Sequence, residues 1–524
     1  MLTTERRLGA GLVVRTGPRA AFRAVTELDG EPHAIRSDLV GGEPVASVNV
    51  NEPIIAIGHI TDLHVTDAES PARFEFVNLE WEDSRFRELL TMQRPHETLT
   101  PRAIEVMVRT LNRITVAPVA GGPLEFIAMT GDAIDNTQRN ELTNFLALLN
   151  GGTVRPDSGA PGYEGVQAEH WPGFICWKPD GPPTGDAYGR DLGFPRHPGL
   201  LERAVEPFEA AGLRLPWIGC YGNHEEVCQG VGRITPALAR AMTGSRKPIA
   251  LPSGLDRETA LETFVRRPEF FMSGESIEVA SDAMRRPISR GEFVESLVLS
   301  GSHGFTAENQ AGETAYYVHD TPAVRFITLD TVCPEGGADG RIDPPQLYWL
   351  ERRLEEAHSS FRSRDGSIVR TSTRDRLVVV LSHHGYETLA NPRAENRSDE
   401  LLRLLHRFGN VVLWISGHIH ANRITPRPGP PGAQGFWEVT TSSLVDWPCQ
   451  GRVVELFDAG AGILGIACTM IDHDGRVEGG LDDLPALAGL HRELAGNVPF
   501  NGFDSWRPGT SADRNAILLL NKPF

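Results

Sequence analysis

The sequence predicts a layered α/β fold whose core strands run mostly parallel. The first observation is a set of short, continuous apolar runs, which are typical of strands buried on both faces. These runs are residues 53–60, 124–130, 215–221, 323–329, 376–382 and 410–416. The second observation is that helical patterns lie between them, at residues 99–114, 138–149, 344–357 and 398–408. Strand and helix that alternate along a chain indicate sheets covered by helices.

Two long stretches interrupt this alternation. Residues 151–200 are dense in glycine and proline, and residues 227–315 are mixed and weakly periodic. Structureless loops of this length are uncommon inside a compact domain unless they are functional. We therefore predict two insertions that cover or shape a site.

The ends of the chain differ from its centre. After residue 416 the apolar pattern becomes short and alternating, at residues 435–442, 451–457 and 463–472, and predicts a closing antiparallel sheet. The domain boundaries follow from these changes of pattern. We expect an N-terminal extension at 1–50, the main domain at 51–475 and a C-terminal extension at 476–524.

The composition excludes several classes of protein. The chain has 524 residues, 40% apolar and 23% charged, which is ordinary for a globular domain. Its formal net charge of −18 repels long nucleic acid and anionic lipid, and no basic cluster offsets it. The six cysteines form no CxxC motif, which favours buried thiols. We see no export signal and no membrane span, and therefore expect a cytoplasmic location.

Polar clusters follow five of the predicted strands. Their sequences are "DLH" (62–64), "GDAID" (131–135), "GNHE" (222–225), "SHH" (382–384) and "GHIH" (417–420). Ligands of α/β sheets bind outside the carboxyl ends of the strands, so the five clusters can converge on one crevice. Each cluster alone is explained by an ordinary turn or helix cap. Turns and caps do not explain why all five clusters occur at the ends of predicted strands.

The converging side chains suit a pair of transition-metal ions. The candidate ligands are Asp62, His64, Asp132, Asn223, His383, His418 and His420. Mixed imidazole and oxygen donors favour manganese, iron or zinc over calcium or magnesium. Seven candidates exceed the needs of one tetrahedral ion and suit two ions that share a carboxylate. Two such ions can catalyse an in-line displacement at phosphorus.

The five motifs resemble those of the calcineurin-like metallophosphoesterases, and the long spacers resemble an actinobacterial-type subgroup with large inserts. The resemblance implies a four-layer α/β/β/α sandwich of two mixed sheets. It also implies that Asp62, His64 and His420 hold the first metal, that Asn223, His383 and His418 hold the second, and that Asp132 bridges both.

The same resemblance implies a reaction in which a metal-bridging hydroxide attacks phosphorus and His224 is the general acid. Adjacent side chains diverge on an extended backbone, so His224 is not expected to bind the ion that Asn223 binds. An imidazole titrates near neutrality, which suits proton donation to a leaving group. A histidine that only positions other groups is the alternative for His224. Asp135 is expected to support the ligands.

The substrate is left open by the motifs. We expect a small phosphoester, either a monoester or a diester, and assign Arg423 and His384 to the substrate side. A cyclic-nucleotide phosphodiesterase or nuclease on the same scaffold is one alternative, and a noncatalytic metal-binding scaffold is another. The metal pair, the oligomeric state and the role of both termini are not determined by the sequence.

Overall fold

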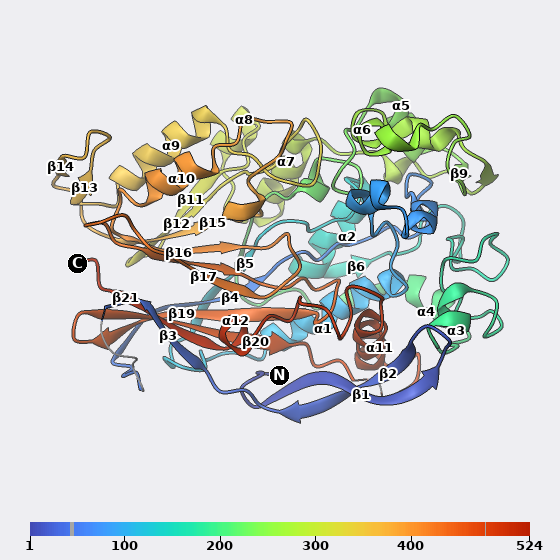
Figure 1. Ribbon diagram of the computed structural model, residues 1–524, viewed down its shortest axis with the longest axis horizontal. Coiled ribbons are helices and arrows are strands. Elements are labelled where there is room, and N and C mark those ends of the chain that lie inside the picture. Colours follow the sequence, from blue (N-terminus) through green and yellow to red (C-terminus); the bar gives the residue numbers. More distant parts are fainter. Residues whose placement is uncertain (42–46, 477) are drawn as a thin grey trace.

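Two β-sheets form the centre of the computed structural model, which describes residues 1–41, 47–476 and 478–524 (Figure 1). The first sheet has seven strands in the order β3 (Ala34–Leu39), β21 (Ala516–Asn521), β20 (Ile463–Asp472), β19 (Gln450–Gly460), β4 (Glu52–Ile60), β5 (Leu124–Met129) and β8 (Trp217–Gly219). The second has six, in the order β11 (Tyr317–Asp320), β12 (Val324–Thr328), β15 (Leu377–Leu381), β16 (Val411–Ser416), β18 (Phe436–Thr440) and β17 (Arg423–Arg427). Both sheets contain parallel and antiparallel pairs.

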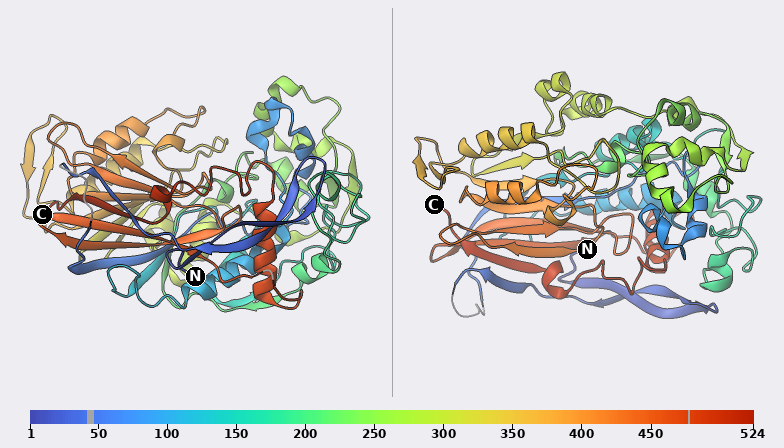
Figure 2. Two further views of the ribbon diagram at one scale, coloured as in Figure 1. Left: turned by 60° about the horizontal axis from the view of Figure 1, so that its bottom comes forward. Right: turned by 45° about the horizontal axis from the view of Figure 1, so that its top comes forward.

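The two sheets pack against each other, and helices cover their outer faces (Figures 1 and 2). Strand β15 shows the arrangement, because its side chains alternate between two cores. Val379 and Leu381 belong to the core shared with the seven-stranded sheet. Val378 and Val380 pack with leucines of α9 (Pro344–Glu355) and α10 (Ser398–Leu405). On the other side, α1 (Thr100–Leu111) and α2 (Arg139–Asn150) pack on the seven-stranded sheet, and α11 (Leu484–Gly496) packs on α1. The predicted four-layer α/β/β/α sandwich is therefore confirmed.

The central strands run parallel, as the continuous apolar runs predict. In one sheet β4, β5 and β8 are parallel neighbours, and in the other β12, β15, β16 and β18 are. The helices start where the sequence supplies caps. The Asp343 side chain accepts a hydrogen bond of 2.8 Å from Gln346 N at the start of α9, directly before two prolines. Gln138 and Glu141 form a capping box on α2.

The prediction of one closing antiparallel sheet after residue 416 is wrong. Strand β18 pairs in parallel with β16 and belongs to the six-stranded sheet. Strands β19 and β20 are antiparallel to each other, but β19 extends the seven-stranded sheet by pairing with β4. Alternation along a strand shows that one face is more buried than the other, and it does not show which sheet supplies the partner.

The chain ends contribute to the sheets. Strands β1 (Arg6–Thr16) and β2 (Ala21–Asp29) form a separate hairpin, whereas β3 pairs in parallel with β21 at the edge of the seven-stranded sheet. Between β20 and β21 lie α11 and the short α12 (Ser511–Arg514). The boundaries at residues 50 and 475 stay predictions, but elements on both sides of them share one sheet.

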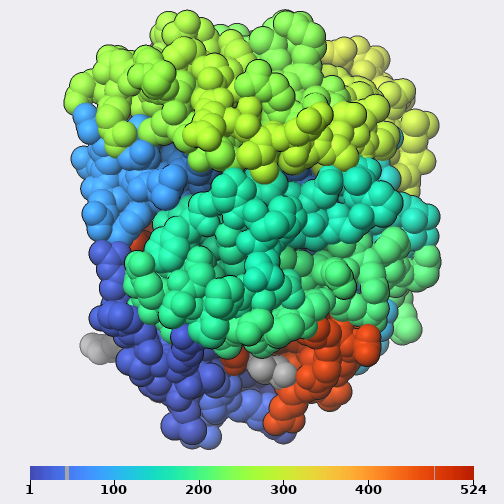
Figure 3. All heavy atoms as spheres, turned by 90° about the vertical axis from the view of Figure 1, so that its right-hand side faces the viewer, coloured from blue at the N-terminus to red at the C-terminus, as the bar shows by residue number. Residues whose placement is uncertain are grey.

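The two predicted insertions form a large part of one end of the molecule, which Figure 3 shows in teal to yellow-green. The first contains β6 (Gly152–Val154) and α3 (Ala187–Asp191), with α4 (Leu200–Val205) and β7 (Phe208–Ala210) after it. The second contains α5 (Pro236–Met242), β9 (Arg246–Pro248), α6 (Ala260–Arg266), β10 (Ser276–Glu278), α7 (Arg290–Gly301) and α8 (Ala307–Gly312). A further hairpin, β13 (Ser360–Arg362) and β14 (Ile368–Arg370), follows α9.

All six cysteines are buried and none is paired. This agrees with the expected buried thiols. In the part of the chain that the structure describes, no helix combines the length and apolar character that a membrane crossing requires.

Candidate metal centre

The five polar clusters lie together at the carboxyl ends of the parallel strands of both sheets. The ends of β4 and β5 are joined by a hydrogen bond of 3.1 Å from Asp62 N to Gly131 O. Likewise, Gly417 N donates to His383 O at 3.0 Å and joins the ends of β15 and β16. The His383 ring then crosses between the sheets, because its Nδ1 lies 2.8 Å from Thr130 O. The predicted convergence on one crevice is therefore what the fold produces.

Asp62, His64, Asp132 and His420 form one group of potential ligands. One ligand atom of each lies within 4.8 Å of the others, and all four side chains are buried. The two imidazoles face each other, with 3.1 Å between His64 Nε2 and His420 Nε2. Asp62 Oδ1 lies 3.3 Å from His420 Nε2, and Asp132 Oδ2 lies 3.7 Å from His64 Nε2.

The protonation of these two imidazoles indicates a cation between them. His64 Nδ1 lies 2.9 Å from Asp135 Oδ1, and His420 Nδ1 lies 2.7 Å from Asp446 Oδ2. Because a carboxylate only accepts, each Nδ1 carries the proton, and each Nε2 of a neutral ring presents its lone pair inward. Two lone pairs and two carboxylates facing one another require a proton or a metal ion. A carboxylate behind each histidine is also the usual support of metal-ligating imidazoles.

A second convergence of acceptor atoms surrounds His383. Its Nδ1 donates to the Thr130 carbonyl, so its Nε2 faces Asn223 Oδ1 at 2.9 Å and Asp132 Oδ2 at 3.1 Å, an arrangement that needs a proton or a metal ion between these atoms. The Asn223 amide is held in this orientation because its Nδ2 donates to Gly230 O at 3.0 Å. The ring of His418 lies 5.1 Å from that of His383, centroid to centroid. Asp132 is thus the carboxylate common to both groups.

The pKa values show that the cluster lacks positive charge. Burial disfavours the protonated form of His383, but the Asp132 carboxylate overcomes this and raises its pKa to about 9. Burial, reinforced by His224, lowers the pKa of His64 to about 4. Burial likewise disfavours the protonated form of His420, but the carboxylates of Asp62 and Asp446 raise its pKa, so the cluster attracts positive charge at two imidazoles. The residues present therefore fit a site for cations.

The backbone at the site is strained in a consistent way. Five of the seven predicted ligands have positive φ angles: Asp62 (52°), His64 (47°), Asp132 (51°), His418 (70°) and His420 (52°). Left-handed backbone at residues with a Cβ costs about 1–3 kcal/mol each and clusters at functional sites. The fold holds these side chains in orientations that an ordinary turn would not supply.

Two glycines of the motifs have steric roles. A Cβ on Gly131, whose φ is +95°, would lie 2.6 Å from His383 Nδ1. A Cβ on Gly417 would overlap Thr61 Oγ1 and Asp62 Oδ2. These motifs begin with glycine because a neighbouring side chain occupies the space where another residue would place its Cβ.

His224 lies beside the cluster and is more exposed than its neighbour His64. Its Nδ1 is 2.6 Å from the backbone oxygen of Asp135, so Nδ1 is the donor. Its Nε2 is 3.9 Å from Asp132 Oδ2, and its ring meets that of His64 edge-on at 4.4 Å. The side chain is 17% exposed, whereas that of His64 is 1% exposed.

Glu225 connects the ends of β5 and β8, a role that the sequence left unassigned. Its carboxylate accepts hydrogen bonds from Gly222 N (2.6 Å), Asp132 N (2.9 Å) and Ile134 N (3.1 Å). Burial, with the nearby Asp132 carboxylate, raises its pKa to about 8. Glu225 therefore fixes the peptide that carries the shared carboxylate.

The two predicted substrate contacts, His384 and Arg423, both have hydrogen-bond partners within the protein. The ring of His384 lies next to His383 and His418, but its Nδ1 bonds Thr331 Oγ1 and its Nε2 bonds Ala338 O, both at 2.9 Å. No ring nitrogen is left for a ligand, although a ligand atom of each of the three histidines lies within 4.8 Å of the others. Arg423 is exposed on β17, and its Nη2 pairs with Glu387 Oε1 at 3.0 Å. The structure gives neither residue a free donor at the cluster.

Asp446 and Arg73 are supporting residues that the motifs missed. Asp446 follows β18 by six residues and bonds His420 Nδ1, so the strand-end pattern used for the other clusters could have found it. Arg73 pairs with Asp135 and bonds Glu97 Oε2 at 2.8 Å. No motif marks Arg73, because its partners come from distant segments.

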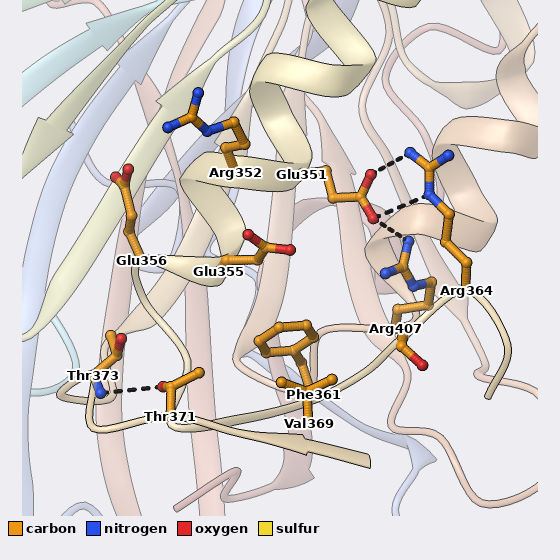
Figure 4. Close-up of a pocket in the computed structure, with 11 residues that line it drawn as sticks. Glu351, Arg352, Glu355, Glu356, Phe361, Arg364, Val369, Thr371, Thr373 and Arg407 are labelled. Carbon is orange, nitrogen blue, oxygen red and sulfur yellow. Dashed lines mark hydrogen bonds and ion pairs between the residues drawn. The ribbon is translucent and has the colours of Figure 1, made fainter. Parts of the chain in front are cut away.

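One surface pocket lies away from this centre (Figure 4). It is lined by residues of α9 and of the β13–β14 hairpin, which precede β15 in the chain, and by Arg407, which precedes β16. The pocket therefore lies at the amino ends of these strands, opposite to the polar clusters. Glu351 pairs there with Arg364 and Arg407, and Arg407 Nη1 lies 2.6 Å from Glu351 Oε1.

Comparison with known proteins adds little beyond this geometry. No family model matches the chain, and no curated protein matches it. Among solved structures, the chain is similar to a dimetal phosphatase from Danio rerio, with 12% identity over 80% of this chain and 100% of that one. The TM-score is 0.37. A similarity of this size carries no conclusion about function, which depends on the site itself.

Proposed function

We propose that the chain is a binuclear metal-dependent phosphoester hydrolase of the calcineurin-like type. The observation that carries the proposal is the pair of facing imidazoles, His64 and His420, whose Nδ1 atoms are both committed to carboxylates. Their Nε2 lone pairs, 3.1 Å apart, need a cation. The acceptor set around His383 needs another, and Asp132 lies between the two.

The residues divide between the two ions by position. Asp62, His64 and His420 would hold one ion, Asn223, His383 and His418 would hold the other, and Asp132 would contribute to both. When bound, such ions supply Lewis acidity and a nucleophile at neutral pH. Manganese, iron and zinc all suit this donor set.

His224 is the residue that we propose as general acid. Its Nδ1 is fixed as a donor to the Asp135 carbonyl, which leaves Nε2 as the atom that gains or loses a proton. The ring is more exposed than that of His64, as a group that meets substrate must be. Gly230 lies close to this ring, because a Cβ at that position would lie 2.3 Å from His224 Nε2.

Metal content and esterase activity together test the proposal. We expect about two transition-metal ions per chain, and release of p-nitrophenol from p-nitrophenyl phosphate or from bis-p-nitrophenyl phosphate. The diester arm and a cyclic-nucleotide panel distinguish monoesterase from diesterase activity. Two bound ions without hydrolysis of any ester would favour a noncatalytic scaffold, and no bound ion would refute the proposal.

A further inference from the structure

Two arginines from outside the motifs meet at Asp446, behind His420. Arg94 Nε lies 2.9 Å from Asp446 Oδ1, and Arg507 Nη1 lies 3.6 Å from Asp446 Oδ2. Arg507 Nη1 also donates to the backbone oxygens of Ile419 (3.2 Å) and His420 (3.3 Å). The Asp446 carboxylate therefore joins both guanidinium groups to an imidazole of the candidate metal centre.

Both arginines retain donors that bind nothing in the described chain. Arg94 Nη1 and the Nε and Nη2 atoms of Arg507 have no hydrogen-bond partner among the described residues. These nitrogens are not enclosed, because they are absent from the buried polar atoms without a partner. The side chains are 12% and 18% exposed. The free donors are thus partly exposed to solvent, next to the carboxylate that supports His420.

The two arginines share the Asp446 carboxylate as an ion-pair partner. The carboxylates of Asp135 and Glu97 also act on Arg94, and that of Asp62 acts on Arg507. Burial lowers the pKa of Arg507, and Asp446 opposes this effect while Arg94 adds to it. Guanidinium groups remain charged in proteins, and their planar donors match carboxylate and phosphate. An anion beside Asp446 would satisfy the free donors.

We propose that Arg94 and Arg507 bind a second anionic group of the substrate, a carboxylate or a further phosphate. This inference rests on the proposed function and narrows its substrate class to phosphoesters that carry two anionic groups on a short linker. The two arginines replace Arg423 and His384 as the substrate contacts.

Binding of matched phosphonates to the metal-loaded protein tests this role. Propylphosphonate carries one anionic group, 3-phosphonopropionate adds a carboxylate, and 1,3-propanediphosphonate adds a phosphonate. We expect at least one of the two ligands with a second anionic group to bind about tenfold or more tightly than propylphosphonate in calorimetry. Comparison of the two then shows which anion the arginines prefer.

The variant Arg507→Gln should lose this preference, so that its affinity falls more for the two ligands with a second anionic group than for propylphosphonate. Arg507→Lys keeps a positive charge and should retain part of the preference. It replaces Arg507→Gln in this test if the glutamine variant folds poorly. Arg423→Gln removes an exposed, paired arginine and should retain all of it. If Arg507→Gln loses the same factor of affinity for all three ligands, Arg507 only positions Asp446, and the inference is overturned.

The same measurements separate this inference from the function on which it rests. A wild-type protein that binds two ions and hydrolyses p-nitrophenyl phosphate, but shows no preference for the ligands with a second anionic group, refutes the inference alone. A protein that binds no metal and hydrolyses no ester refutes the proposed function, and the inference with it.

Discussion

Replacement of Asp446 by asparagine should weaken metal binding without removing any predicted ligand. The Asp446 carboxylate accepts from His420 Nδ1 at 2.7 Å and from Arg94 Nε at 2.9 Å. Its side chain is 3% exposed, so water cannot replace these bonds. Burial opposes ionisation of Asp446, but Arg94 and Arg507 hold its pKa well below the usual range. The carboxylate is therefore charged wherever the protein is folded near neutral pH.

The size of the effect follows from these contacts. The carboxylate keeps the proton on His420 Nδ1 and the lone pair on Nε2, which an asparagine at this position could do only through a neutral oxygen. A hydrogen bond to a charged group contributes about 1.5–3 kcal/mol. Loss of such support typically weakens metal binding or activity about 10–100-fold, which is about 1.4–2.7 kcal/mol. The two estimates agree, so we expect Asp446→Asn to weaken metal binding by about 10–100-fold.

Chelator competition followed by metal analysis measures the affinity, and kcat/KM for p-nitrophenyl phosphate measures activity at saturating metal. Asp458→Asn is the matched control, because Asp458 pairs with Lys522 at 2.7 Å on the exposed part of β19. It should behave as wild type. A metal affinity of Asp446→Asn within twofold of wild type would refute the role of Asp446, whatever the effect on thermal stability.

Three further changes test other parts of the site. His224→Ala should keep its metal and lose about 10²–10⁴-fold in kcat on an ester with a poor leaving group, with a smaller loss on p-nitrophenyl phosphate. Gly417→Ala should lower metal occupancy and destabilise the fold by about 1–3 kcal/mol, because its Cβ overlaps Thr61 and Asp62. Burial raises the pKa of Glu97 to about 7, above its ordinary 4.5. Its contribution to stability is therefore full below about pH 4.5 and lost as the pH rises through about 7, a change of roughly 3 kcal/mol that Glu97→Gln should remove.

Matched controls accompany these variants. Gly409→Ala adds a methyl group where nothing lies within 4 Å, and should leave metal occupancy unchanged. Glu308→Gln alters an exposed carboxyl and should keep the wild-type dependence of unfolding on pH. The general-acid proposal for His224 is contradicted if its alanine variant loses the same factor on esters of good and poor leaving groups. Unchanged metal occupancy in Gly417→Ala would contradict the steric role of Gly417. An unchanged dependence of unfolding free energy on pH in Glu97→Gln would contradict the prediction for Glu97.

The sequence by itself determined the layers and most of the candidate centre. Continuous apolar runs predicted the parallel strands, since a strand buried on both faces has no polar side. The polar residues that end those runs predicted the cluster, because the carboxyl ends of parallel strands meet at one edge. The structure places Asp62, His64, Asp132, Asn223, His383, His418 and His420 there. The apolar runs and the polar motifs are local signals, because each consists of a few consecutive residues.

Tertiary structure decided which sheet each later strand joined and which residues support the ligands. Strand β18 joins one sheet and β19 the other, a choice made by long-range pairing that alternation does not encode. Asp446, Arg94 and Arg507 meet behind His420 although more than 50 residues separate each of them from the next along the chain. Their contacts arise only when the chain is folded, because a salt bridge has no sequence spacing to reveal it. The candidate ligands were therefore readable from the sequence, and the charged residues that hold them in place were not.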